Sequence, residues 1–140
     1  MNRNQFLNVS CRLCLLGAAG IALPSLLGCG ATKTAAYRVP VLERQMRIPL
    51  AALEADGSKI VRPEGWDYDV AVHKTATGYD ALLLKCTHMD NPLYASGTGW
   101  ACHQHGSLFN AEGQVRKGPA EEPLVRYRTE VVSENLIIYT

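Results

Sequence analysis

The sequence lacks a long apolar segment, a charge excess and internal repeats. Its longest apolar stretch, near the N-terminus, has about 15 residues and is interrupted by Pro24, whereas a membrane-spanning helix needs roughly 20. Its 14 basic and 13 acidic residues give a net charge of +1, so no basic surface for nucleic acid is indicated. These absences argue against a helical membrane protein, a repeat protein and a nucleic-acid-binding protein.

Helix patterns are also missing after Cys29, which argues against a parallel α/β architecture. Runs rich in β-branched and aromatic residues alternate there with Gly, Pro, Asn and Asp. They predict strands at residues 43–50, 59–62, 68–74, 79–85, 125–132 and 136–139, and one helical turn at 51–56. We therefore expect an all-β domain of small antiparallel sheets, packed as a sandwich or a partly open barrel.

The strand pattern lapses into Gly-rich loops between Cys86 and Val125. A long region without secondary structure inside a compact domain is usually functional. We therefore expect the functional site in this region.

The N-terminal residues 1–28 are typical of an export signal, with two arginines, no acidic residue and an apolar centre. Residues 26–29, Leu-Leu-Gly-Cys, resemble a bacterial lipobox, which predicts cleavage before Cys29 and lipid attachment to its thiol. A plain cleavage site with an incidental cysteine is the alternative. Residues 2–8 resemble a twin-arginine signal in which Asn4 replaces one arginine. The expected organisation is a signal peptide at 1–28, a tether at 29–36 and a domain at 37–140.

Two short segments each place one cysteine close to one histidine. Cys86 and His88 are separated by one residue, and Cys102 and His105 by two. A 2Fe–2S cluster with two Cys on one iron and two His on the other needs this donor set. Zinc also accepts two Cys and two His, but zinc fingers usually pair Cys with Cys and His with His. A Cys86–Cys102 disulfide is a third alternative for an exported protein.

The residues around these segments favour the iron–sulfur site. Residues 102–109 read Cys-His-Gln-His-Gly-Ser-Leu-Phe, and Gly-Pro-Ala follows at 118–120. With Cys-Thr-His at 86–88, this sequence resembles the Rieske 2Fe–2S family, strongly over residues 82–127 and loosely over 37–140. The resemblance implies three stacked antiparallel β-sheets. It also implies a cluster-binding loop subdomain in which two loops hold the cluster and a third, around Gly118, covers it.

The resemblance also implies a role for each site residue. Cys86 and Cys102 would bind the buried iron, and His88 and His105 would bind the outer iron through Nδ1. Ser107 would donate a hydrogen bond to a bridging sulfide, and Gly106 would allow close backbone approach to the sulfurs.

Three features depart from the high-potential members of the family. Asn91 and Gln104 stand where those members carry a loop-to-loop disulfide, and Phe109 stands where they carry a tyrosine that donates to a ligand sulfur. His103 replaces the usual proline, and we interpret it as an exposed loop residue. His73, on a predicted strand, is assigned no role.

These features predict one-electron transfer, because neutral imidazole ligands give a reduction potential of about −150 to +300 mV. We expect an exported protein, anchored by lipid at Cys29 on the periplasmic or extracytoplasmic face. It would pass electrons between a quinol or partner reductase and a cytochrome-type acceptor, with no catalytic residue of its own. The alternatives are a small electron-transfer subunit of a larger oxidoreductase and a zinc-stapled binding module.

Overall fold

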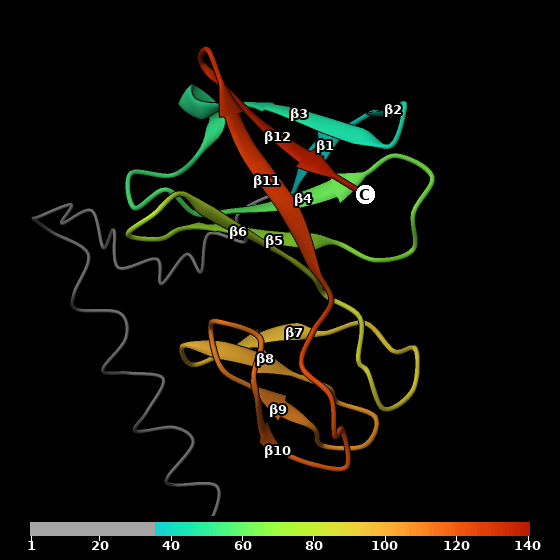
Figure 1. The fold of residues 1–140 in the computed structure, drawn as a ribbon. Coiled ribbons are helices and arrows are strands. Elements are labelled where there is room, and N and C mark those ends of the chain that lie inside the picture. Colours follow the sequence, from blue (N-terminus) through green and yellow to red (C-terminus); the bar gives the residue numbers. More distant parts are fainter. Residues whose placement is uncertain (1–35) are drawn as a thin grey trace, which may run out of the picture. The chain divides into compact units, whose positions relative to one another are not determined.

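The computed structural model describes residues 36–140, which form twelve β-strands and one 3₁₀ turn (Figure 1). The elements are β1 (Tyr37–Val39), β2 (Val41–Leu42), β3 (Gln45–Pro49), η1 (Leu50–Ala52), β4 (Lys59–Pro63), β5 (Val70–Lys74), β6 (Tyr79–Leu83), β7 (Tyr94–Ser96), β8 (Gly99–Ala101), β9 (Leu108–Phe109), β10 (Val115–Lys117), β11 (Arg126–Val132) and β12 (Asn135–Tyr139). Within this described part of the chain, no helix has the length and apolarity to cross a membrane.

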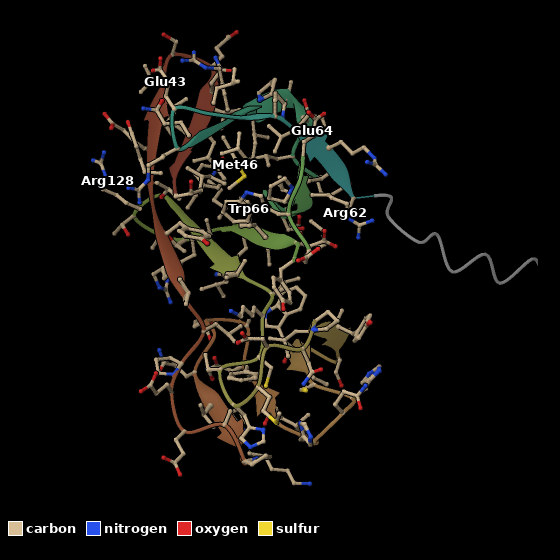
Figure 2. The ribbon with its side chains drawn as sticks, turned by 90° about the vertical axis from the view of Figure 1, so that its right-hand side faces the viewer. Glu43, Met46, Arg62, Glu64, Trp66 and Arg128 are labelled. Atoms are coloured by element: carbon tan, nitrogen blue, oxygen red, sulfur yellow. The ribbon has the colours of Figure 1, made fainter. Side chains whose placement is uncertain are left out.

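The larger sheet has eight strands in the order β1-β4-β5-β6-β11-β12-β3-β2. Strand β11 joins its two halves, because Arg126 and Tyr127 pair with β6 whereas residues 128–132 pair with β12. Both halves contribute buried side chains to one core. These include Met46 and Ile48 of β3, Val61 of β4 and Ile138 of β12. Figure 2 shows Met46 in this interior. Burial alternates along β3, as expected for a strand with one buried face.

The smaller sheet has four antiparallel strands in the order β10-β9-β8-β7. A second core connects it to the larger sheet, since Ala71 of β5 and Leu82 of β6 pack in the same cluster as Phe109 of β9. Cys86 and Cys102 belong to this second core. The candidate site is therefore built on the smaller sheet and anchored to the middle of the larger one.

The all-β prediction is confirmed, and each of the six predicted strands is present with slightly different bounds. The helical turn predicted at residues 51–56 is shorter and begins one residue earlier, as η1 over Leu50–Ala52. The predicted signal peptide and the lipid site at Cys29 lie outside the described residues, as does the predicted tether except for Ala36.

Three details of the sheets differ from the expectation. The region between Cys86 and Val125 carries a sheet of its own, whose strands of two or three residues are too short to show periodicity. Strand β1 pairs with β4 in parallel, so the larger sheet is mixed rather than wholly antiparallel. Two of the three expected sheets are joined through β11.

Candidate metal centre

Two loops place the four candidate ligands, and both are closed in the same way. The first ligand loop, residues 86–91, closes through the Cys86 N–H, which donates to the Asn91 carbonyl at 2.8 Å. The second ligand loop, residues 102–107, closes through the Cys102 N–H, which donates to the Ser107 carbonyl at 2.9 Å. Each cysteine is thus fixed at the base of its loop, and its histidine lies within the loop.

Gly106 gives the second ligand loop its shape. It has φ of +78°, a left-handed conformation that glycine adopts without steric cost. Its N–H donates to the Cys102 carbonyl at 2.9 Å. An added Cβ would meet no described protein atom within 4 Å. Glycine is therefore favoured here by its backbone conformation and not by lack of space for a side chain.

The four candidate ligands separate into a buried pair and an exposed pair. Cys86 and Cys102 are 0% and 1% exposed and are free thiols, so the alternative of a disulfide between them is wrong for this structure. His88 and His105 are exposed, and their ring centroids lie 5.0 Å apart with the rings nearly perpendicular. The thiols therefore face the core and the imidazoles face solvent.

The surroundings of Cys86 favour ionisation of its thiol. Burial opposes the charged form, but hydrogen bonds from the backbone N–H groups of His88 and Met89, and from the side chains of Cys102 and Ser107, outweigh it and lower the pKa of Cys86. Because the thiolate is the form that binds metal, this environment suits a cysteine ligand.

A third loop, residues 118–122, is bonded to both ligand loops. The Ala120 N–H donates to Ser107 Oγ at 3.0 Å in a buried position. Thr87 Oγ1 donates to the Glu122 carbonyl at 2.7 Å. Ser107 Oγ therefore accepts from Ala120, while its side chain also bonds the Cys86 thiol. Sequence reasoning missed the contacts of Thr87 and Ala120, because each bond joins segments far apart in the sequence.

The donor set fits a dinuclear cluster. Each iron of a 2Fe–2S centre needs only two protein ligands, since two sulfides complete its coordination. The buried thiol pair and the exposed imidazole pair match these two requirements. Within residues 36–140, no three side chains of His, Cys, Asp or Glu are grouped to hold a single metal ion.

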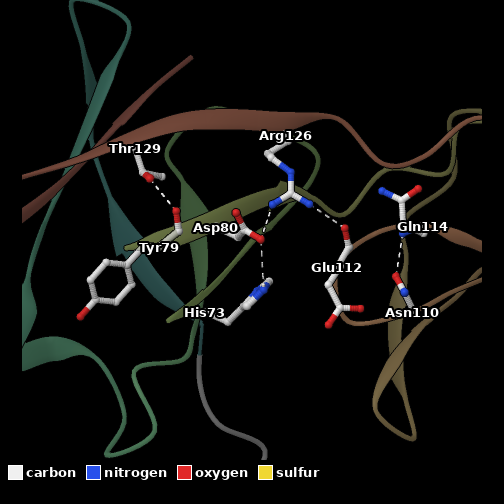
Figure 3. Close-up of polar contacts among 8 residues, drawn as sticks. All are labelled: His73, Tyr79, Asp80, Asn110, Glu112, Gln114, Arg126 and Thr129. Carbon is white, nitrogen blue, oxygen red and sulfur yellow. Dashed lines mark hydrogen bonds and ion pairs between the residues drawn. The ribbon is translucent and has the colours of Figure 1, made fainter. Parts of the chain in front are cut away.

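The remaining histidines have other surroundings. His103 is exposed, and its ring stacks on Tyr94 with centroids 4.7 Å apart. His73 lies on β5, where its Nε2 is 3.5 Å from Asp80 Oδ2. Asp80 also pairs with Arg126, whose Nη2 donates to the Glu112 carbonyl at 2.8 Å (Figure 3). His73 therefore belongs to a polar contact between the larger sheet and the β9–β10 turn.

Comparisons with known proteins agree with this geometry. Residues 50–128 match the family model of the Rieske [2Fe-2S] domain. The ubiquinol-cytochrome c reductase iron-sulfur subunit of Rickettsia typhi is 41% identical over 58 residues, which cover 37% of this chain and 33% of that protein. The chain thus matches about a third of that relative's length. The chloroplastic cytochrome b6-f complex iron-sulfur subunit of Chlamydomonas reinhardtii is 27% identical over 161 aligned positions, which cover 100% of this chain and 74% of that protein.

The plasma membrane Rieske protein of Synechocystis PCC 6803 has a similar solved structure. It is 27% identical, with a TM-score of 0.53, and the match covers 66% of this chain and 95% of that one. The fold, the arrangement of donors and the family match point to one conclusion. The chain belongs to the Rieske [2Fe-2S] domain family, whose cofactor is a Rieske-type 2Fe–2S cluster.

Proposed function

We propose that Cys86, Cys102, His88 and His105 hold this cluster and that the protein passes single electrons through it to and from partner proteins. The observation that carries the proposal is the separation of donors, with two thiols inside the second core and two adjacent imidazoles at the surface. When bound, the cluster supplies a one-electron redox couple at a mild potential.

Burial and exposure of the four candidate ligands determine where electrons can enter and leave the site. Burial of Cys86 and Cys102 excludes water from the thiolate side. Exposure of His88 and His105 leaves the other side open to a partner. Electrons therefore enter and leave at the imidazole edge, where a redox partner can make contact.

The partners that we propose are a quinol or a partner reductase as donor and a cytochrome-type protein as acceptor. Two relatives support this proposal, since they are subunits of a ubiquinol-cytochrome c reductase and of a cytochrome b6-f complex.

Spectroscopy of the purified protein tests the cluster. We expect a red-brown protein that, after dithionite, gives the rhombic electron paramagnetic resonance (EPR) signal of a His-ligated 2Fe–2S centre. Iron and sulfide should be present in equal amounts. A colourless protein that contains zinc and gives no such signal would refute the proposal and support the binding-module alternative.

We further propose that the protein is exported and attached to a membrane through lipid on Cys29, at the periplasmic or extracytoplasmic face. The lipobox-like residues 26–29 support this attachment. More than one acyl chain gives lasting membrane binding, because each buried CH₂ contributes about 0.8 kcal/mol.

Replacement of Cys29 by serine should release the mature protein from membranes. The measurement is the partition between membrane and soluble fractions, together with the intact mass, which should lose the acyl groups. Cys14→Ser is the matched control, because Cys14 leaves with the proposed signal peptide and its loss should change neither quantity. Membrane attachment of Cys29→Ser equal to that of the unaltered protein would contradict lipid anchoring.

Replacement of Phe109 by tyrosine should raise the reduction potential. Phe109 is 3% exposed and packs in the same core as both cysteines, and it cannot donate a hydrogen bond. A donor to a ligand sulfur stabilises the reduced form. One hydrogen bond of about 0.5–1.5 kcal/mol corresponds to a rise of about 20–60 mV for one electron. Redox titration of Phe109→Tyr beside Phe109→Leu measures this, since leucine adds no donor. An unchanged or lower potential for the tyrosine variant would count against the hydrogen-bond argument.

A further inference from the structure

No disulfide holds the first ligand loop within the described part of the chain, because Cys86 and Cys102 are both free. Its own closing bond, from the Cys86 N–H to the Asn91 carbonyl, fixes the two ends of the loop. His88 and Met89 lie between those ends and are exposed. One contact from outside the loop precedes His88, since Thr87 Oγ1 donates to the Glu122 carbonyl.

Asp90 receives two such contacts from other parts of the chain. Tyr68 Oη donates to the Asp90 carbonyl at 2.6 Å, and Lys85 Nζ lies 3.0 Å from Asp90 Oδ1. The Asp90 side chain is 75% exposed, so its ion pair contributes little. The bond from Tyr68 acts on the main chain itself, two residues after His88.

Tyr68 is held by its neighbours. The carboxylate of Asp69 accepts two hydrogen bonds from Arg62 of β4, both at 2.7 Å, and the Asp69 carbonyl accepts from the Leu84 N–H at 2.8 Å. Lys85 Nζ lies 5.5 Å from the ring centroid of Tyr68, within cation–π range. Figure 2 shows Arg62 on the larger-sheet part of the molecule. The hydroxyl of Tyr68 therefore reaches the loop from the segment between β4 and β5, which Arg62 and Leu84 hold in place.

We propose that Tyr68 is a positioning residue for the cluster, since its hydrogen bond to the Asp90 carbonyl fixes the backbone that carries His88. The inference rests on the proposed function, in which His88 is a ligand of the outer iron. The bond ties the first ligand loop to the β4–β5 connection, so the orientation of His88 depends on that connection.

The test compares Tyr68→Phe with Tyr139→Phe. Tyr139 is a matched control on β12, because its hydroxyl also donates one hydrogen bond, to Glu130 at 2.9 Å, and a cation, Arg128, lies over its ring. Both variants keep the ring and lose one hydroxyl. Three quantities are measured on the protein with its cluster: the EPR line widths, the rate of iron release to a chelator, and hydrogen–deuterium exchange of residues 86–93.

Tyr68→Phe should broaden the EPR lines, since an unfixed His88 samples several orientations. It should also speed exchange in residues 86–93 and iron release by about fivefold, the effect of one lost hydrogen bond. Tyr139→Phe should change none of the three. Equal behaviour of the two variants would overturn the inference, and so would faster exchange with unchanged EPR lines. Absence of the Rieske EPR signal from the unaltered protein would instead overturn the proposed function, and the exchange comparison would still report whether Tyr68 holds the loop.

Discussion

Replacing His105 with alanine is expected to remove the 2Fe–2S cluster, whereas replacing His103 with alanine should leave it in place. Both imidazoles are exposed and belong to the second ligand loop. Only the ring of His105 lies beside that of His88, with centroids 5.0 Å apart, while His103 stacks on Tyr94. In the proposed ligand set, the outer iron would keep a single protein ligand without His105, which is too few to retain it.

Iron and sulfide content and the EPR spectrum measure this difference directly. The His105→Ala protein should contain less than about a tenth of the iron of the unaltered protein, because even the loss of a hydrogen-bond partner of a metal ligand typically costs about 10–100-fold in metal affinity. It should also unfold at a lower temperature, because the free energy of metal binding contributes to the free energy of folding. If His103→Ala lost its cluster and His105→Ala kept it, the proposed ligand set would be wrong.

Replacing Gly99 with alanine should destabilise the smaller sheet more than any other glycine-to-alanine change in it. A Cβ at Gly99 would overlap the backbone carbonyl oxygen of Phe109 and lie 3.0 Å from the Cα of Asn110. These are backbone atoms of β9 and its turn, and Trp100 of β8 pairs directly with Phe109. The overlap can be relieved only by separating β8 from β9, which should cost about 3 kcal/mol, at the upper end of overpacking effects.

Gly97→Ala is the matched control in the same hairpin. Gly97 has φ of +59°, and an added Cβ would meet no described atom within 4 Å. This change should therefore cost only the strain of a left-handed alanine, about 1–2 kcal/mol. Urea denaturation of both variants, followed by the visible absorbance of the cluster and by circular dichroism, measures the two free energies of unfolding. Equal destabilisation would show that the β8–β9 contact tolerates a side chain.

The elements that could be predicted from the sequence are those that carry a local pattern. Alternating burial in β3 and the apolar residues of β5 and β6 lie within windows of five residues, long enough to predict strands. The candidate ligands could also be predicted from the sequence, because each Cys–His pair is contained in one loop of the structure.

The features that could not be predicted depend on contacts between residues that lie far apart in the sequence. Strands β8 and β9 have three and two residues, and only their pairing with each other and with β7 and β10 makes them a sheet. The parallel pairing of Tyr37 with Val61 depends on where the chain enters the larger sheet. The bond from Tyr68 to Asp90 spans 22 residues, and no spacing rule links a tyrosine to a carbonyl at that distance.

The position of β11 also affects how the molecule folds. Strands β6 and β11 are neighbours in the larger sheet, yet both ligand loops and the whole smaller sheet lie between them in the sequence. The pairing of β6 with β11, which completes the larger sheet, therefore requires that the chain first returns from the smaller sheet. Long-range closures of this kind give a high contact order, and sheet proteins dominated by them fold in milliseconds to seconds. We expect stopped-flow refolding in that range, with formation of the β6–β11 pairing as a late step.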